Sequence, residues 1–212
     1  MCPIDDGVIK YDRSQYTKSD ALKTDEYVPL EKWRKTLHQL KLIGEYLPEK
    51  IGYGNLSQKK DYHELHAPLQ RSQFVITGTQ TGGLVNLQGN SYTRVLDYNF
   101  ESWSVKTMGP LEASSEALTH AAIYEADREI TAVFHIHDKN IWKGMIEGGY
   151  PATSDKIPYG TKEMANAVED LIKDKPLGLI VMKGHEDGVI SYGKTLEEAG
   201  KKILEVYDKF GR

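Results

Sequence analysis

The sequence lacks the features of a disulfide-bonded, secreted or membrane-spanning chain. Cys2 is its single cysteine, so an intramolecular disulfide is excluded, which is typical of a protein from a reducing compartment. The N-terminal sequence MCPIDDGVIKYDRSQ has no apolar core of the kind found in a signal peptide. No apolar run approaches the length that spans a bilayer. These absences predict a cytoplasmic protein without a membrane partner.

Concentrated positive charge is also missing. The chain has 27 Lys and Arg against 31 Asp and Glu, a net charge of -4, and its basic residues are spread along the sequence. Nucleic-acid-binding proteins usually gather basic residues on one face, so we expect no nucleic-acid partner. What the chain does have is 39% hydrophobic residues among 212, enough to bury the core of one domain.

The first half of the chain predicts an N-terminal arm over residues 1–28, followed by a single domain over residues 29–212. The arm is polar and shows no periodicity. From Pro29 to Leu47, apolar residues recur every three or four positions, which predicts an amphipathic helix begun by Pro29 and stopped by Pro48. GYGNLS (52–57) is predicted as a glycine-rich turn. QFVITGT (73–79) is predicted as a strand that enters a second glycine-rich loop, TGTQTGG (77–83), and YTRVLDYNF with SWSVKTMG as paired strands.

The second half alternates more clearly between helices and strands. SSEALTHAAIYEADRE predicts a helix, ITAVFHIH a strand, and a shorter helix follows from Asn140. Thr161 is expected to cap another helix, and residues 177–183 and 188–193 form two strands before a C-terminal helix capped by Thr195. Without repeats or a linker-like segment, this order indicates one α/β domain.

Two histidines end the apolar strand AVFHIH. Residues two apart on a strand share a face, so His135 and His137 project to one side and Ile136 to the other. Two imidazoles at that spacing can converge on one metal ion, at about 2.0 to 2.1 Å each. The alternative is a pair of histidines satisfied by hydrogen bonds at a strand end, and the spacing alone leaves both open.

Further residues join this pattern. His185 also follows an apolar strand, and ligands gather at strand ends in α/β sheets, so it is a candidate third ligand. Glu116 lies in the first turn of a helix, behind Ser114 and Ser115. It could act as a base beside the metal, or it could simply complement the helix dipole. His120, one turn later, is either a packing residue or a support for the site.

The segments GNLS, FVIT, SSEALTHAAIY, AVFHIH and KGHEDGVISYGKTLEEA occur in the order and spacing of the class II aldolase/adducin family. The chain resembles this family from about Gly54 to its C-terminus. Members include metal-dependent fuculose-phosphate and rhamnulose-phosphate aldolases, ribulose-phosphate epimerase and methylthioribulose-phosphate dehydratase. The resemblance implies a three-layer α/β/α fold around a central, largely antiparallel or mixed sheet. It also implies a C4 homotetramer with active sites between subunits.

The resemblance assigns roles by position. His135, His137 and His185 match the ligands of one divalent metal per subunit, most often zinc, with manganese, cobalt or iron as alternatives. Glu116 matches the acid/base. Tyr207 lies near the C-terminus, as does a family tyrosine that protonates the leaving group, although it is one of 13 tyrosines here. The positions that match the family's phosphate pocket are Asn55, Ser57, Thr77, Gly78, Thr79, Ser114 and Ser115.

The implied activity is reversible aldol cleavage of a small phosphorylated ketose through a metal-bound enediolate. Three departures bear on the substrate. Gln58, Lys59 and Lys60 stand where the family has an arginine, TGTQTGG replaces a Thr-Pro-Ser-Gly loop, and the segment between His137 and His185 is short. The same metal site would serve a sugar-phosphate dehydratase or epimerase. The alternative to an enzyme is a non-catalytic, adducin-like module that serves as an oligomeric interaction domain.

Overall fold

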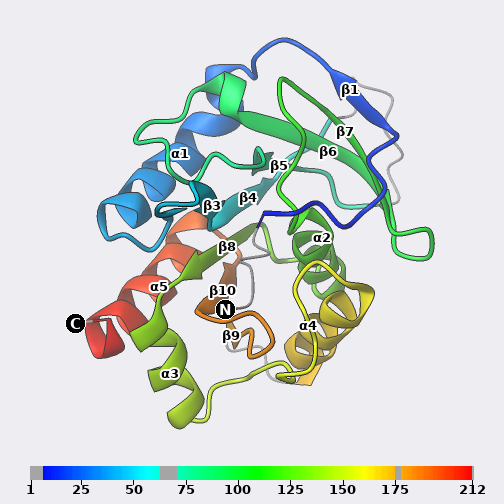
Figure 1. Ribbon diagram of the computed structural model, residues 1–212. Helices are drawn as coiled ribbons and strands as arrows, with labels where there is room; N and C mark the ends of the chain where they lie inside the picture. The colour runs from blue at the N-terminus through cyan, green and yellow to red at the C-terminus, as the bar shows by residue number, and fades with distance from the viewer. Residues whose placement is uncertain (1–6, 63–70, 175–177, 212) are drawn as a thin grey trace.

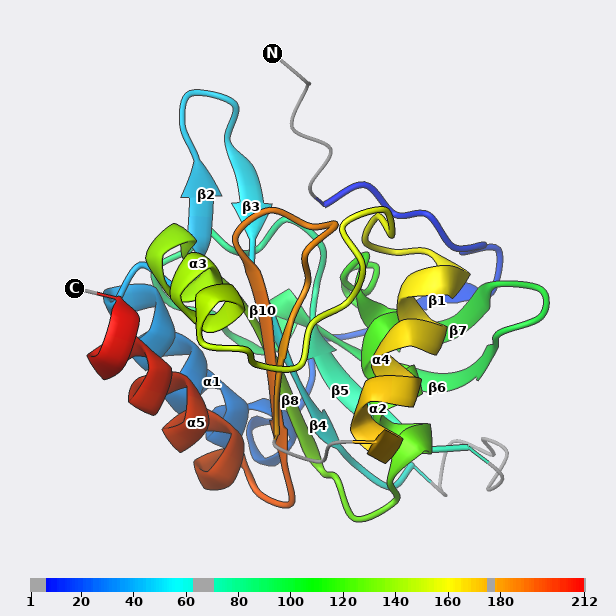
Figure 2. The same cartoon turned by 90° about the horizontal axis from the view of Figure 1, so that it is seen from below.

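The computed structural model describes residues 7–62, 71–174 and 178–211, which are arranged as an eight-stranded sheet between two layers of helices (Figure 1 and Figure 2). The strand order is β1-β7-β6-β5-β4-β8-β10-β9. Neighbouring strands are antiparallel except for β1 and β7, which are parallel. The predicted α/β class with a largely antiparallel central sheet is therefore confirmed.

The strands of the central sheet are β1 (Tyr16–Lys18), β4 (Asn55–Lys59), β5 (Phe74–Thr77), β6 (Tyr92–Asn99), β7 (Ser104–Gly109), β8 (Ala132–His137), β9 (Leu179–Val181) and β10 (Gly188–Gly193). A separate hairpin is formed by β2 (Gly44–Tyr46) and β3 (Ile51–Tyr53). The α-helices are α1 (Thr24–Gln39), α2 (Ala117–Ala126), α3 (Lys139–Glu147), α4 (Lys162–Asp174) and α5 (Leu196–Phe210).

The two faces of the sheet bury two separate hydrophobic cores. Helices α1, α3 and α5 cover one face, and α2 and α4 cover the other (Figure 2). Strand β8 contributes to both cores, because its side chains alternate between the two faces. Phe134 and Ile136 are buried on the side of α1 and α5, whereas Val133 is buried on the side of α2 and α4. Alternation along the strand places His135 and His137 on the same side as Val133, as the sequence predicts.

Residues 7–28, predicted as part of an N-terminal arm, contribute a strand and buried side chains to the fold; residues 1–6 lie outside the described residues. Strand β1 pairs with β7 at the edge of the sheet. Tyr11 and Leu22 are buried, and the Tyr11 hydroxyl donates a hydrogen bond to the Ala113 carbonyl. The few apolar residues of this segment show no helical periodicity. Burial of one or two of them is nevertheless enough to hold the segment against the edge of the sheet.

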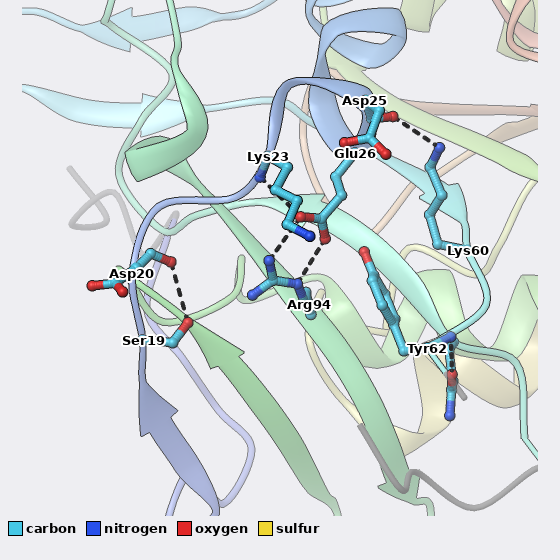
Figure 3. Close-up of polar contacts among 9 residues, drawn as sticks. Ser19, Asp20, Lys23, Asp25, Glu26, Lys60, Tyr62 and Arg94 are labelled. Carbon is cyan, nitrogen blue, oxygen red and sulfur yellow. Dashed lines mark hydrogen bonds and ion pairs between the residues drawn. The ribbon is translucent and has the colours of Figure 1, made fainter. Parts of the chain in front are cut away.

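Helix α1 begins before Pro29 and ends before Leu47, so both predicted boundaries are wrong. Proline lacks the N–H that would bond the Asp25 carbonyl, and Lys60 Nζ donates to that carbonyl instead, at 3.3 Å (Figure 3). At the other end Lys41 adopts φ of 61°, and the N–H groups of Lys41 and Leu42 bond back to His38 and Leu37. This left-handed cap stops the helix although the apolar spacing continues into the hairpin.

A largely buried ion pair joins α1 to the sheet. Glu26 accepts two hydrogen bonds from Arg94 on β6, both at 2.7 Å, and a third from the Lys23 N–H at 2.9 Å (Figure 3). Burial acts to raise the pKa of Glu26, but these bonds outweigh it and lower that pKa. We expect Glu26→Gln to reduce the free energy of unfolding at pH 7 by about 1.5 to 3 kcal/mol, measured by urea denaturation.

The surface pair of Glu169 and Lys173 is the matched control for this prediction. Its side chains are 32% and 55% exposed, against 13% for both Glu26 and Arg94. Glu169→Gln is expected to change the free energy of unfolding by about 0.5 kcal/mol or less. Equal losses in the two variants would contradict the structural role of the Glu26 pair.

The remaining predicted elements of the second half are confirmed, with ends shifted by a few residues. Thr161 Oγ1 accepts a bond from the Met164 N–H, and Thr195 Oγ1 from the Glu198 N–H, as helix caps do. The predicted turn over 52–57 is wrong, because residues 51–53 and 55–59 are strands separated by Gly54. Within the described ranges, no helix is long and apolar enough to cross a membrane.

Candidate metal centre

Strands β8 and β10 bring the three predicted ligands together. His135 and His137 lie opposite Ile190 and Gly188 in the antiparallel pair. His185 precedes β10 in the turn from β9, and a Cβ on Gly188 would lie 2.7 Å from its ring and 3.2 Å from the His135 ring. The glycine therefore leaves the space in which the imidazoles of His185 and His135 approach each other.

The geometry of the cluster fits a single metal ion. The ligand atoms of His135, His137 and His185 all lie within 4.8 Å of one another, and all three residues are buried. The Nε2 atoms of His135 and His137 are 2.9 Å apart. Two nitrogens about 2.0 to 2.1 Å from one ion, at angles near 90° to 110°, are separated by about 2.8 to 3.4 Å. The observed distance falls within that range.

In two of these rings the Nδ1 atom, which faces away from the centre of the cluster, lies within hydrogen-bond distance of an oxygen atom. His135 Nδ1 lies 3.2 Å from the Val189 carbonyl oxygen, and His137 Nδ1 lies 2.7 Å from the Tyr46 hydroxyl. Metal-binding histidines are commonly held through the ring nitrogen that does not touch the ion. The Nε2 atoms, which face each other, are therefore the candidate ligand atoms.

Burial keeps these histidines neutral, which is the form that binds metal. Desolvation is the largest cause in every case: it lowers the pKa of His135 to about 4 and brings the pKa values of His137 and His185 well below 6.5. Proximity to one another lowers the last two further, because one positive ring disfavours a second. The donor set is thus three uncharged imidazoles at neutral pH, a set typical of zinc and related ions.

A pocket opens beside the three histidines and contains most of the other predicted residues. Glu116 lines it from the position just before α2, and only 2% of its surface is exposed. Gly54, with φ of +78°, turns the chain there; a Cβ on it would lie 2.7 Å from Ile43. The predicted phosphate-binding residues that line the pocket are Asn55, Gly78, Thr79, Ser114 and Ser115.

Three predicted residues do not line this pocket. Ser57 is fully buried behind it, where its hydroxyl lies 2.7 Å from both His120 Nδ1 and the Tyr124 hydroxyl. Thr77 Oγ1 accepts a bond from the Leu56 N–H. Tyr207 packs partly buried against the core beneath α1 and α5. The position of Ser57 follows from strand geometry: it lies on the same face of β4 as Asn55, but two residues further along, where α2 covers it.

The other histidines stay outside the cluster. His120 is completely buried and bonded to Ser57, so it supports the packing between α2 and β4. His38 lies on the partly exposed side of α1. His63 and His66, expected in a polar loop, lie outside the described residues.

Sequence reasoning missed several residues around the pocket. Tyr53 and Tyr159 line it, and their rings lie 5.5 Å from His137 and 4.6 Å from His185, measured between centroids. Tyr46 lies behind His137. Gln80, also at the rim, accepts a bond from the Gly52 N–H at 2.8 Å and so links the glycine-rich loop to the hairpin. These residues come from separate segments, and no local motif marks them.

Arg34 fixes the glycine-rich loop from behind. Its guanidinium is buried under α1 and donates to the carbonyls of Thr81, Gly82 and Val85. A Cβ on Gly82 would lie 2.3 Å from the Gly44 carbonyl, so the loop packs directly on the hairpin backbone. The loop therefore presents its polar groups to the pocket from a defined position.

The structure is thus an α/β/α sandwich with a glutamate at the start of a helix and three buried histidines that could hold a metal ion. The sequence model of the class II aldolase and adducin N-terminal domain matches residues 49–209. The chain belongs to the class II aldolase and adducin family. The predicted family is thereby confirmed.

Solved structures share the fold at low sequence identity. An L-fuculose 1-phosphate aldolase superposes with a TM-score of 0.61 at 18% identity, over 89% of this chain and 84% of that one. The L-fuculose-1-phosphate aldolase from Thermus thermophilus gives 0.61 at 18%, over 88% and 91%. A sugar-phosphate aldolase from Thermotoga maritima gives 0.60 at 16%, over 84% and 89%. No curated protein sequence matches the chain.

Proposed function

We propose that this protein is a divalent-metal-dependent lyase that reversibly cleaves a small phosphorylated ketose by an aldol reaction. The observation that carries the proposal is the convergence of His135, His137 and His185 in one buried cluster, next to a pocket that contains Glu116. Membership of the class II aldolase family supports it, since those aldolases depend on divalent metals.

The histidines would hold the ion, with zinc as the leading candidate and manganese, cobalt or iron as alternatives. When bound, such an ion supplies a Lewis acid that polarises a substrate carbonyl and stabilises the negative charge that develops on its oxygen. Glu116 then removes the proton from the carbon next to the carbonyl in the condensation direction and returns it in the cleavage direction. Its burial beside the histidines keeps the carboxylate close to that carbon and away from bulk water.

The anionic end of the substrate would lie against neutral donors. Ser114 and Ser115 contribute hydroxyls at the start of α2, where backbone N–H groups and the helix dipole favour an anion. The side-chain oxygen of Asn55 is buried without a hydrogen-bond partner in the described part of the chain, so this amide can turn to a ligand. Gly78 and Thr79 complete the proposed phosphate site, and Ser57 and Thr77 are not part of it.

Two further features belong to the proposal. Relatives named L-fuculose 1-phosphate aldolase and sugar-phosphate aldolase support a phosphorylated sugar as the substrate class. We also propose a C4 homotetramer. Tyr207 does not line the pocket of its own chain, so a role as the acid for the leaving group would require it to act at a neighbouring subunit.

The test of the proposal is the metal content of protein purified without added metal, measured by elemental analysis beside His137→Ala. We expect close to one zinc, manganese, cobalt or iron per chain in the unaltered protein. The variant is expected to lose it, since two imidazoles bind far more weakly than three. His38→Ala is the matched control and should keep the metal. Unaltered protein that neither contains metal nor takes it up would refute the lyase and favour an adducin-like interaction module.

Substrate assays separate the reactions that one metal site can support. Ketose phosphates, ribulose phosphate and methylthioribulose phosphate are incubated with the metal-loaded protein, and the products are identified by NMR. An aldehyde with a three-carbon ketose phosphate indicates aldol cleavage. An epimer or a dehydrated product would assign the protein to the epimerases or dehydratases of the same family.

A further inference from the structure

Tyr46 links the hairpin to the metal centre. Its hydroxyl lies 2.7 Å from His137 Nδ1, and its ring packs 4.7 Å from the Tyr53 ring, measured between centroids. The hairpin that carries both tyrosines rests on the glycine-rich loop through Gly44 and Gly82. Tyr46 lies just before residue 49, where the family match begins.

The two strand histidines have different partners behind them. His135 Nδ1 faces the Val189 carbonyl, which can only accept, so the neutral ring carries its hydrogen on Nδ1 and a lone pair on Nε2. The 2.9 Å separation of the Nε2 atoms suits two nitrogens that bind one ion, and in metal-free protein it is a hydrogen bond only if His137 carries its hydrogen on Nε2. In that tautomer His137 Nδ1 is an acceptor, and the Tyr46 hydroxyl donates to it.

Binding of a metal through Nε2 requires the other tautomer of His137. The hydrogen must then reside on Nδ1, where it donates to the Tyr46 oxygen. A tyrosine hydroxyl can both donate and accept, whereas a carbonyl or a carboxylate could serve only one of the two states.

We infer that Tyr46 is a positioning residue for the metal site, whose hydroxyl reverses its hydrogen bond as His137 changes tautomer on metal binding. The inference rests on the proposed function, since it requires that the three histidines hold a metal ion. It goes beyond that function in assigning a role to a residue of the hairpin and in stating how the site is prepared for its ion.

Tyr46→Phe removes one oxygen and keeps the ring. We expect its affinity for zinc and cobalt to fall about 10- to 100-fold, the range found when the outer partner of a ligand histidine is removed. Affinity is measured by competition with a chromophoric chelator. Tyr16→Phe is the matched control: it deletes a hydroxyl that bonds the Gly109 carbonyl at the far edge of the sheet, and it should bind metal normally.

The tautomers are observed directly in unaltered protein labelled with ¹⁵N at histidine. We expect His137 to carry its hydrogen on Nε2 in the metal-free state and on Nδ1 with zinc bound, while His135 keeps it on Nδ1 in both. This measurement does not depend on the folding of a variant. A His137 that already carries its hydrogen on Nδ1 without metal would overturn the exchange.

The outcomes separate this inference from the function on which it rests. Metal binding by the unaltered protein, weakened in Tyr46→Phe and unchanged in Tyr16→Phe, supports the role of Tyr46. Equal affinity in all three proteins overturns that role and leaves the proposed metal site intact. Failure of the unaltered protein to bind metal removes the proposed function itself.

Discussion

Replacement of Glu116 by glutamine is expected to lower kcat by about 10²- to 10⁴-fold while leaving the bound metal in place. Glutamine keeps the size and polarity of the side chain but cannot take or return a proton, and a positioned base contributes about that factor. Glu116 lines the pocket without belonging to the three-histidine cluster, so metal content should not change. The measurement is steady-state cleavage of whichever ketose phosphate the unaltered protein accepts, with elemental analysis of the same sample.

Glu125→Gln is the control on the same helix. Its carboxylate accepts a bond from the Tyr98 hydroxyl at 2.6 Å and does not line the pocket. It should keep kcat within about threefold, since it does not touch the substrate in the proposed site. A Glu116→Gln enzyme that turns over at a comparable rate would eliminate Glu116 as the acid/base and leave the metal site untouched.

The three-histidine cluster could be predicted from the sequence because its members lie at the end of an apolar strand or just after one. Alternation on a strand fixes the side to which His135 and His137 point, whatever the rest of the fold. His185 needed one further assumption, that the strand before it lies near theirs in the same sheet; β9 pairs with β10, and β10 pairs with β8. Sheet order is not encoded locally, and here the family resemblance supplied it.

Residues 7–53 were harder to predict because tertiary contacts determine their structure. The apolar spacing from Pro29 to Leu47 does not distinguish one long helix from a shorter helix that is followed by buried loop residues. Leu42 and Ile43 are buried in both arrangements, but here they lie beyond the left-handed cap at Lys41. The tolerance for Pro29 inside α1 depends on Lys60, which is distant in sequence.

The same limit applies to the pocket. Ser57 was predicted as a phosphate ligand from a Gly-Asn-x-Ser pattern that suggests a turn, but on strand β4 it shares the face of Asn55 and lies about 6 to 7 Å further along, against His120 and Tyr124. Tyr46 reaches His137 because the chain just before the hairpin lies at the end of β8, where the His137 N–H donates to the Leu42 carbonyl. No spacing in the sequence predicts a contact between residues 91 positions apart.

The second large effect concerns acid stability in the absence of metal. His120, His135, His137 and His185 are all buried, and burial is the largest cause that lowers their pKa values from 6.5, to about 4 for His135. Above pH 7 both the folded and unfolded chains hold these rings neutral, so they do not affect stability. Below pH 6.5 the unfolded chain binds protons that the folded protein resists, and the free energy of unfolding must fall.

The slope of that fall is steep. Each such histidine contributes about 1.4 kcal/mol per pH unit between its unfolded and folded pKa values, so four together contribute on the order of 5 kcal/mol per unit. A domain is stable by only about 5 to 15 kcal/mol. We therefore expect metal-free protein to unfold cooperatively between about pH 4 and 6, followed by tryptophan fluorescence and circular dichroism in the presence of a chelator.

Bound zinc should move this transition to lower pH, because the ion binds only neutral imidazoles and only the folded arrangement of all three. The variant His120→Asn removes one titrating ring outside the three-histidine cluster. Its metal-free form should lose stability less steeply with acidity, by about 1.4 kcal/mol per pH unit, even if it is less stable at pH 8. Metal-free protein that keeps its full stability at pH 4.5 would contradict this account of the buried histidines. A transition unmoved by zinc would instead argue that the three-histidine cluster does not hold the ion in the folded state.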